Sequence, residues 1–379
     1  MSRLRGSKRA GRGDSAGAEE RYYVATQWQL MWRKLKRHRL AMLGLLILVT
    51  IYGLAALSDV LGTCDVQKRH TRFIYCPPQR IHFFDAEGGF HLRPFVYGFK
   101  SSRDPVTREL RYEEDPDQRF PLRFFVAGSE YRFWGLIPGR THVFGVDGPG
   151  YLFLFGTDKL GRDLFSRTLE AARISLSIGL VGVGLSFVLG CILGGISGYY
   201  GGRVDTVIQR VIEFLLSIPT LPLWMALAAA VPKEWPPLKV YLAITVLLSV
   251  IGWCGLARVV RGKLISLREE DYVLAARIAG ASDGRIIRRH LLPGFLSYLI
   301  VSLTLAVPRM ILGETALSFL GLGLRPPVVS WGVLLSTAQD VKVVTLYPWI
   351  LIPGVFVVLT VLAFNFLGDG LRDAADPYH

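Results

Sequence analysis

Residues 266–293 read SLREEDYVLAARIAGASDGRIIRRHLLP, a charged stretch between long apolar segments. Ser266 is followed three residues later by a glutamate, the spacing of a capping box, which predicts that a helix starts there. Gly280 breaks the helical pattern. Asp283 is placed to cap a second helix, and Pro293 is expected to stop it. The stretch therefore predicts two short helices joined by a bend, a shape suited to docking on another protein.

The composition around this stretch is that of a membrane protein. Hydrophobic residues make up 51% of the 379 residues, and the mean hydropathy is +0.36. Several apolar segments of about 20 residues are long enough to cross a bilayer. The net charge of +14 would suit nucleic acid, but a positive excess beside apolar spans marks cytoplasmic loops. We therefore expect membrane lipid and no nucleic acid as a partner.

Six apolar segments are expected to span the membrane. Basic residues precede the first segment and follow the fourth, which places both termini and residues 266–293 in the cytoplasm. Pro219 and Pro222 must bend or interrupt the third segment. The expected spans cover residues 40–60, 174–198, 207–231, 240–257, 295–314 and 347–366.

The rest of the chain divides around these spans. Residues 1–39 form a basic cytoplasmic tail that ends in an amphipathic helix at the membrane surface, and residues 40–61 form the first transmembrane helix. Residues 62–156 alternate apolar and polar side chains between turn residues, which predicts a small β-rich domain on the outer side. Residues 157–379 form the core, with a re-entrant or interfacial hairpin expected at 316–340.

One face of the second span carries only small residues. Glycine or serine recurs at every fourth position, and such a stripe lets the backbone of another helix approach closely in lipid. The pattern predicts tight helix packing but does not identify the partner helix. Its members are Gly182, Ser186, Gly190, Gly194 and Gly198.

Four cysteines are too few for a disulfide scaffold, and no two of them form a CxxC pair. Cys191 and Cys254 fall in apolar spans and are interpreted as small core residues. Cys64 and Cys76 lie together outside the spans and are a candidate disulfide if that side is oxidising. Cys64 also ends a sequence, LGTC, that loosely imitates a lipoprotein cleavage site. The apolar run before it is longer than a signal core, which favours an uncleaved span.

The residues that enzymes and metal sites need are missing. The sequence holds no GxxxxGK[ST] phosphate loop, no HExxH and no Cys/His metal spacing. Asp158, Asp163 and Glu170 have no histidine or cysteine beside them, which favours helix capping and surface pairing over catalysis. We therefore expect no catalytic residue, no metal site and no cofactor in this chain.

Two ionisable residues fall near the outer end of the fifth expected span. Arg309 and Glu314 are costly in lipid, and such groups usually face a bundle interior or a water-filled path. One interpretation is a structural pair, or side chains that reach the interface. The other is the lining of a translocation path or gate.

The charged stretch 266–293 resembles a motif of a known family. Its spacing matches the EAA loop of ABC-importer permeases, which reads EAA, three residues, glycine, nine residues and then I-x-L-P. Leu274 and His290 stand where the pattern has glutamate and isoleucine. In that family the loop is a coupling helix seated in a groove of the cytoplasmic ATPase. The resemblance implies the same role here for Ala275, Ala276, Gly280, Ala281, Leu292 and Pro293.

Further segments are similar to the C-type subunit of the dipeptide/oligopeptide permease family. QWQLMWRKLKRHRLAMLGL, at residues 27–45, resembles that subunit's entry into its first span. The other matching segments are GTDKLGRDLFSR (156–167), ARISLSIGL (172–180), GYYGGRVD (198–205), ALSFLGLGLRPPVVSWG (316–332) and GDGLRDAADP (368–377). The section between the first two spans is longer than the usual loop and is the part least covered by the resemblance.

The resemblance implies an all-α polytopic protein of the bacterial cytoplasmic (inner) membrane. Its six transmembrane helices would have the type I importer permease (MetI-like) fold, with a β-rich extracytoplasmic insert between helices 1 and 2. The implied function is a permease subunit of an ATP-driven importer for peptides or related solutes. The implied partners are a homologous B-type permease, two ATPase subunits that bind ATP and Mg, and an extracytoplasmic solute-binding protein.

Two other functions compete with an importer subunit. An ion-coupled secondary transporter or channel would show inverted repeats and coupling-ion residues at the midplane, and neither is evident in the sequence. A membrane-anchored ligand receptor would use the spans only as anchors. The coupling pattern and the small-residue stripe count against a receptor.

Overall fold

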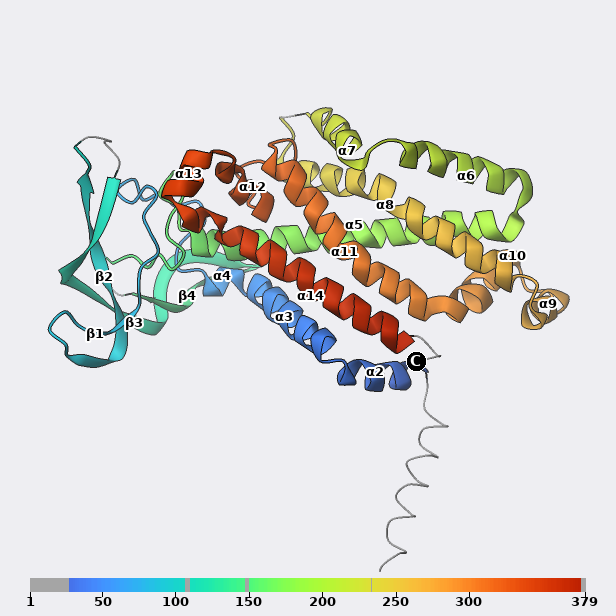
Figure 1. The fold of residues 1–379 in the computed structure, drawn as a ribbon, viewed down its shortest axis with the longest axis horizontal. Coiled ribbons are helices and arrows are strands. Elements are labelled where there is room, and N and C mark those ends of the chain that lie inside the picture. Colours follow the sequence, from blue (N-terminus) through green and yellow to red (C-terminus); the bar gives the residue numbers. More distant parts are fainter. Residues whose placement is uncertain (1–26, 106–109, 147–149, 233, 376–379) are drawn as a thin grey trace, which may run out of the picture.

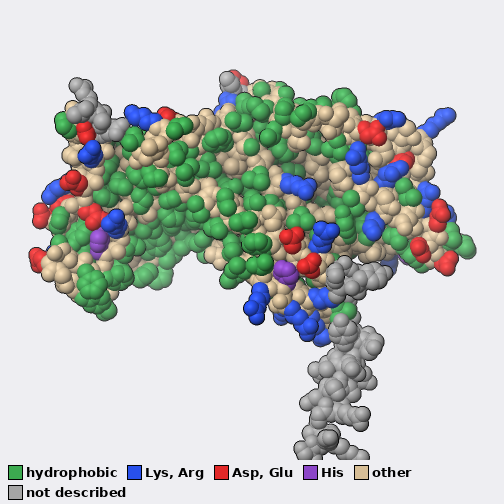
Figure 2. Space-filling view, viewed as in Figure 1, with side chains coloured by type: hydrophobic (Ala, Val, Ile, Leu, Met, Phe, Trp, Pro, Cys, Tyr) green, Lys and Arg blue, Asp and Glu red, His purple; other side chains and the backbone are tan. Residues whose placement is uncertain are grey.

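A computed structural model describes the chain over residues 27–105, 110–146, 150–232 and 234–375. Long helices form the middle of the molecule, with an antiparallel sheet at one end and helix α9 (Asp271–Ile278) at the other (Figure 1). Hydrophobic side chains cover most of the surface between the two ends (Figure 2). Charged side chains gather at the ends. The tail expected before residue 27 and the last residues, 376–379, lie outside the described residues.

Five helical segments in the described ranges are long and apolar enough to cross a membrane. A sixth crossing would consist of two shorter helices, α6 (Gly202–Ser217) and α7 (Thr220–Ala229), which are bent by 88° relative to each other. The break falls at Pro219, as expected, because proline cannot donate a helical hydrogen bond. The five segments are α3 (Arg39–Ala56), α5 (Leu164–Tyr200), α8 (Pro237–Leu267), the continuous run Asp283–Phe319 and the run Pro348–Ala375.

The last two runs are composite. The run Asp283–Phe319 begins with α10 (Asp283–Ile286), passes through a π-helical turn (η1, Ile287–Leu291) and a 3₁₀ turn (η2, Leu292–Phe295), and ends with α11 (Leu296–Phe319). In the expected hairpin region, 316–340, α11 ends at Phe319 and two short helices follow, α12 (Trp331–Leu335) and η3 (Ser336–Gln339). Helix α13 (Val341–Leu346) comes directly after this region. The final run consists of η4 (Pro348–Leu351) and α14 (Ile352–Ala375).

The first transmembrane helix ends earlier than expected. Helix α3 stops at Ala56, and a separate turn of helix, α4 (Ser58–Leu61), follows. Before it, α2 (Gln27–Arg37) is the expected amphipathic helix. Its buried residues Met31 and Leu35 pack against Ala374 near the end of α14, so part of its apolar face covers protein rather than lipid. Figure 1 shows α2 and the end of α14 side by side, on the side of the bundle away from the sheet.

The β-rich insert expected at 62–156 is a four-stranded antiparallel meander. The strands follow one another in the order β1 (His82–Phe84), β2 (Phe90–Arg103), β3 (Leu110–Phe133) and β4 (Ile137–Val146). The first half of β3 pairs with β2, with Arg103 opposite Leu110, and the second half pairs with β4. Strand β3 thus carries the sheet from its outer part to a hairpin beside the bundle.

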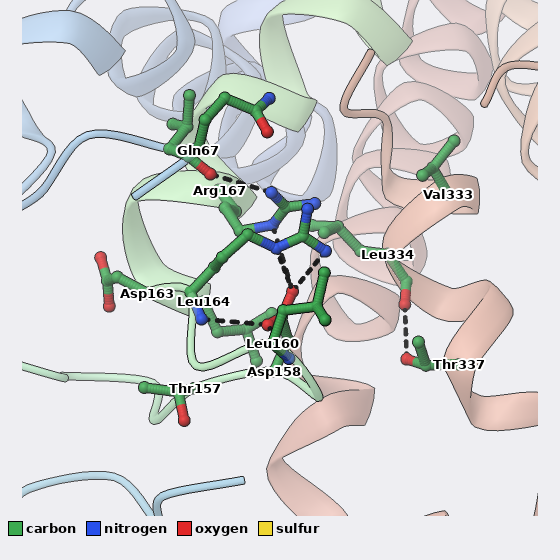
Figure 3. A network of polar contacts seen from close by, with 12 residues as sticks. Gln67, Thr157, Asp158, Leu160, Asp163, Leu164, Arg167, Val333, Leu334 and Thr337 are labelled. Carbon is green, nitrogen blue, oxygen red and sulfur yellow. Dashed lines mark hydrogen bonds and ion pairs between the residues drawn. The ribbon is translucent and has the colours of Figure 1, made fainter. Parts of the chain in front are cut away.

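A buried polar network joins the insert to the start of α5 (Figure 3). Asp158 accepts hydrogen bonds from Arg162 Nε at 2.8 Å and from two backbone N–H groups, and Arg167 Nη1 donates to the carbonyl of Val66 at 2.9 Å. Asp163 caps α5, because its carboxylate accepts the N–H of Ser166 at 2.8 Å. Capping by Asp163 is therefore confirmed. The expected surface pairing of Asp158 is wrong, because the Asp158 and Arg162 side chains are both buried.

Cys64 and Cys76, the candidate disulfide, are free thiols in the structure. Each backbone is held by a different part of the chain: the N–H of Cys64 donates to Ser166 Oγ and that of Cys76 to Thr157 Oγ1. Burial raises the pKa of both thiols, that of Cys64 to about 12, so both are protonated near neutral pH.

The small-residue stripe of α5 packs against α8, the partner helix that the sequence left open. A Cβ on Gly194 would lie 2.5 Å from the carbonyl oxygen of Ala257, and one on Gly198 would lie 2.7 Å from that of Arg261. Higher on the same face, Ser249 Oγ donates to the carbonyl of Gly182 at 3.0 Å. The two backbones approach so closely that the contact has no room for a methyl group at Gly194 or Gly198.

We predict that Gly194→Ala destabilises the protein, because its methyl group would collide with the backbone of α8. Overpacking of this kind typically costs about 1–3 kcal/mol. Gly184→Ala is the matched control, since Gly184 lies on the same helix and a Cβ there meets no atom within 4 Å. The thermal midpoint of the purified protein should fall for Gly194→Ala only. Equal midpoints for the two variants would contradict the packing described here.

Candidate functional site

The charged stretch 266–293 folds differently from its sequence-based prediction. Helix α8 continues through Ser266 to Leu267, so no helix begins there, and α9 begins only at Asp271. The capping-box prediction is wrong because Leu264, one turn before the end of α8, is fully buried and keeps this turn packed on the bundle.

The structure also differs from the predicted roles of Asp283 as a helix cap and Pro293 as a helix stop. Asp283 is the first residue of α10 rather than its cap, and the preceding serine makes no side-chain capping bond. Pro293 does not stop the chain's helical course. It lies in the first turn of η2, where a missing N–H is tolerated, and the helix continues into α11.

Helix α9 ends in a glycine-dependent turn. The N–H of Gly280 donates to the carbonyl of Arg277 at 3.0 Å, and the N–H of Ala281 donates to that of Ala276 at 3.1 Å. Gly280 has φ +80°, and this pair of bonds defines a Schellman motif, whose left-handed residue is normally glycine. The glycine four residues after Ala276 therefore has a physical reason: it turns the chain from α9 into α10.

The stretch has a buried side and an exposed side. Val273, Ile286 and Leu291 are fully buried in a cluster with residues of α8 and α11, and Ala276, Ala281 and Leu292 are half-buried against this cluster. On the other side, Ile278 is 88% exposed. Leu274, Ala275, Gly280 and Pro293 are exposed as well. The expected coupling residues thus divide between the contact with the bundle and the free surface of α9.

The end of α5 holds the start of α10. The hydroxyls of Tyr199 and Tyr200 donate to the two carboxylate oxygens of Asp283 at 2.7 and 3.2 Å. The guanidinium of Arg277, on α9, lies over the ring of Tyr199 at 5.7 Å and donates to its hydroxyl at 3.4 Å. Helices α5, α9 and α10 are therefore joined through one tyrosine pair.

A second contact holds α6 to α8 just beside the first. Arg261 donates to both carboxylate oxygens of Asp205, from Nε at 2.5 Å and from Nη2 at 2.6 Å. Ser197 Oγ, on α5, donates to the same carboxylate at 2.5 Å and accepts from Gln209 Nε2 at 3.1 Å. Such a two-point arginine–carboxylate pair fixes orientation as well as distance.

The sequence did not identify these two contacts as part of the site. Tyr199, Tyr200 and Asp205 lie in the GYYGGRVD segment, and the segment was recognised only through its resemblance. Their partners Arg261 and Asp283 are far away in the chain. The sequence signal that could have indicated these contacts is the tyrosine pair at the end of a membrane helix, followed by an acidic residue.

Arg309 lies at a hollow in the flank of the bundle. The hollow has a volume of about 330 Å³ and lies between α5, α8 and α11. Ser186, Gly252, Tyr298 and Ser302 are among its lining residues, and Arg309 is exposed there. Among the described residues, the Arg309 side chain has no hydrogen-bond or ion-pair partner. The rest of the lining is mainly apolar, so the hollow presents one cation and a few polar groups in an otherwise apolar wall.

Glu314 is in a different environment and does not pair with Arg309. It is fully buried and accepts hydrogen bonds from the hydroxyls of Ser175 at 3.1 Å, Ser318 at 2.7 Å and Ser330 at 2.6 Å. Ser330 caps α12, and the N–H of Trp331 donates to Ser175 Oγ at 3.2 Å. The carboxylate thus joins α5, α11 and the segment before α12, which is a structural arrangement.

The family models match two parts of this chain. Residues 187–378 match the model described as the binding-protein-dependent transport system inner membrane component. Residues 26–78 match the model for the N-terminal TM domain of oligopeptide transport permease C. Most of the β-rich insert lies between the two matches.

Several curated relatives are transport permeases. The chain is 44% identical over 224 residues to the dipeptide transport system permease protein DppC of Bacillus subtilis (strain 168), covering 59% of this chain and 68% of that protein. It is 44% identical over 229 residues to the oligopeptide transport system permease protein OppC of Haemophilus influenzae, covering 60% and 71%.

A solved structure also matches, at lower similarity. The inward-facing MetNI methionine ABC transporter aligns with a TM-score of 0.43 and 20% identity, covering 55% of this chain and 95% of that one. The sequence matches are sufficient to assign the family. A family model covers half of the chain, and the relatives above are matched over more than two thirds of their length. The chain belongs to the family of binding-protein-dependent transport system inner membrane components, and it is a permease subunit.

Proposed function

We propose that this chain is the C-type permease subunit of an ATP-driven importer for peptides or related small solutes. The single observation that carries the coupling role is the exposed apolar surface of α9, held on the bundle by Asp283 and the tyrosine pair of α5. The names of the curated relatives support peptides as the solute class. The chain forms one half of the path, and a homologous B-type permease forms the other.

In this proposal, energy enters through partners. Two ATPase subunits bind ATP and Mg, and α9 sits in a groove of one of them. When the ATPases close, α9 moves. The motion passes to α5 through the Tyr199 contacts with Arg277 and Asp283, and to α8 through the buried cluster that contains Val273. A switch of this kind needs rigid elements that move against each other, because packed interfaces have discrete arrangements rather than continuous deformation.

The orientation follows from the same assignment. The end of the bundle with α9, α2 and the C-terminal part of α14 would lie in the cytoplasm, so both termini would be cytoplasmic. The β-rich insert would then lie outside the cytoplasmic membrane, where the solute-binding protein delivers its ligand. The basic residues of α2 support this orientation, since Lys34, Lys36 and Arg37 occupy its last turn.

The two candidate path residues have separate roles in this proposal. Arg309 is a lining residue of the path, because it reaches a hollow without a partner side chain. Glu314 holds three elements of the permease together and lines no path.

We predict that Ile278→Glu weakens binding of the ATPase to the permease, because it places a charge on the exposed apolar side of α9. Val341→Glu is the matched control: Val341 is 77% exposed against 88% for Ile278, and it lies at the opposite end of the molecule. The measurement is the amount of ATPase that co-purifies with the permease pair. Loss of ATPase with both variants, or with neither, would contradict the docking role of α9.

We predict that Gly280→Ala impairs coupling more than Gly284→Ala does. A Cβ at either position meets no atom within 4 Å, but only Gly280 has a positive φ. The left-handed conformation costs a non-glycine residue about 1–2 kcal/mol, so the turn after α9 should loosen. Transport per ATP hydrolysed, measured in proteoliposomes, should fall for Gly280→Ala. An equal ratio in both variants would count against the turn as part of the coupling element.

We predict opposite effects for Arg309→Gln and Glu314→Gln. Arg309→Gln should reduce import without lowering the thermal midpoint, because the side chain has no partner to lose. Glu314→Gln should lower the midpoint, because an amide nitrogen cannot accept a serine hydroxyl and an unmet buried group costs about 1–3 kcal/mol. The two readouts are uptake of labelled peptide and thermal unfolding. A destabilised Arg309→Gln with normal Glu314→Gln would reverse the assignment.

A further inference from the structure

The hairpin between β3 and β4 reaches the end of the first transmembrane helix. Trp134, at the tip of the hairpin, donates from its ring Nε1 to the carbonyl of Ala56 at 3.1 Å. Its backbone N–H donates to the Asp59 carboxylate at 3.0 Å. Ala56 is the last residue of α3, a helix long and apolar enough to cross the membrane. The tip of the hairpin therefore lies at the depth where this helix leaves the bilayer.

The polar side of this tip is satisfied by protein. Arg173, on α5, lies over the Trp134 ring at 5.7 Å and forms ion pairs with Asp59 at 2.9 Å and Glu170 at 2.7 Å. Ser58 Oγ donates to Glu170 at 3.2 Å. These contacts fix the tip to α4 and α5 on one side only.

The other side of the tip is apolar and bare. Trp134 is 55% exposed, Leu136 82% and Ile137 64%; the first two lie in the turn, and Ile137 is the first residue of β4. The turn is closed by backbone hydrogen bonds, since the N–H groups of Gly135 and Leu136 donate to carbonyls three residues earlier. A soluble domain rarely exposes a contiguous cluster of large apolar side chains.

The composition of the turn matches a membrane interface. Exposed Arg132 and Arg140 flank the apolar residues, and tryptophan with arginine is the usual combination at the level of lipid headgroups. Figure 2 shows hydrophobic surface running from the long helices onto the side of the insert nearest to them. Through Trp134 the tip contacts Ala56, the last residue of α3, and the next residue, Leu57, is 48% exposed.

We propose that the β3–β4 tip inserts into the outer half of the bilayer beside α3, with lipid as its occupant. Leu136 and Ile137 enter the acyl region, Trp134 lies at its boundary, and Arg132 and Arg140 face the headgroups. This lipid contact then adds to the covalent connections, the polar network at the start of α5 and the Trp134 hydrogen bonds that already hold the insert. The inference depends on α3 spanning the membrane and is independent of the solute that the permease carries.

The test compares two exposed leucines in the full-length chain, reconstituted in bilayers of phosphatidylethanolamine and phosphatidylglycerol. Spin labels are attached to Leu136→Cys and, as the matched control, to Leu92→Cys. Leu92 is 87% exposed on β2, which pairs with β1 and the first half of β3 and has no pairing with β4. Cys64→Ser serves as the background, since the other three cysteines are buried. Collision rates are measured with oxygen, which concentrates in lipid, and with a water-soluble nickel chelate.

We expect the ratio of oxygen to nickel collisions to be several-fold higher at residue 136 than at residue 92. Equal ratios with ready access of nickel to both labels would place the tip in water and overturn the proposal. Protection of residue 136 from both reagents would show that a protein surface covers the tip, which would also overturn it. Both labels replace exposed side chains, so neither variant should disturb folding.

Discussion

The close approach of α5 and α8 is the constraint on which the rest of the permease depends. At Gly194 and Gly198 the two backbones leave no room for a methyl group, and the helices are held in this register along the stripe. Helix crossings in lipid gain stability from such contacts because no hydrophobic effect drives apolar helices together there. The register brings Arg261 of α8 to Asp205 and brings Tyr199 and Tyr200 beside Asp283. A wider spacing of the two helices would separate these groups.

The coupling element is built on this pair of helices. Its buried side chains, among them Val273 and Ile286, pack against the C-terminal part of α8 and the start of α11. The Schellman turn at Gly280 sets the angle between α9 and α10. The apolar face of α9 is left free as a result. The same α5–α8 contact continues upward to Ser186, which lines the hollow that Arg309 faces. One packing contact therefore links the proposed docking surface of α9 with the candidate path.

The sequence predicted the parts of this structure that depend on local pattern. Apolar length identified the spanning helices, Pro219 located the break between α6 and α7, and the alternation in residues 62–156 predicted the sheet. It failed where tertiary contacts decide: Ser266 has the spacing of a helix start, but burial of Leu264 extends α8 past it. Pairings across the chain, such as Asp205 with Arg261, have no local signal. Glu314 shows the same limit, since one sequence position suits both a gate and a buried structural carboxylate.

Val273 of α9 is buried in one cluster with Val260 and Leu264 of α8, so we expect a rigid coupling of the two helices. It is tested most directly by the distance between spin labels at Ile278→Cys on α9 and Val246→Cys on α8, where both side chains are exposed. The distance is measured by pulsed electron resonance in the assembled importer, without nucleotide and with a non-hydrolysable ATP analogue that closes the ATPase pair. We expect the same narrow distance distribution in both states. A shifted or broadened distribution on nucleotide binding would show that α9 flexes on its own and is not rigidly coupled to α8.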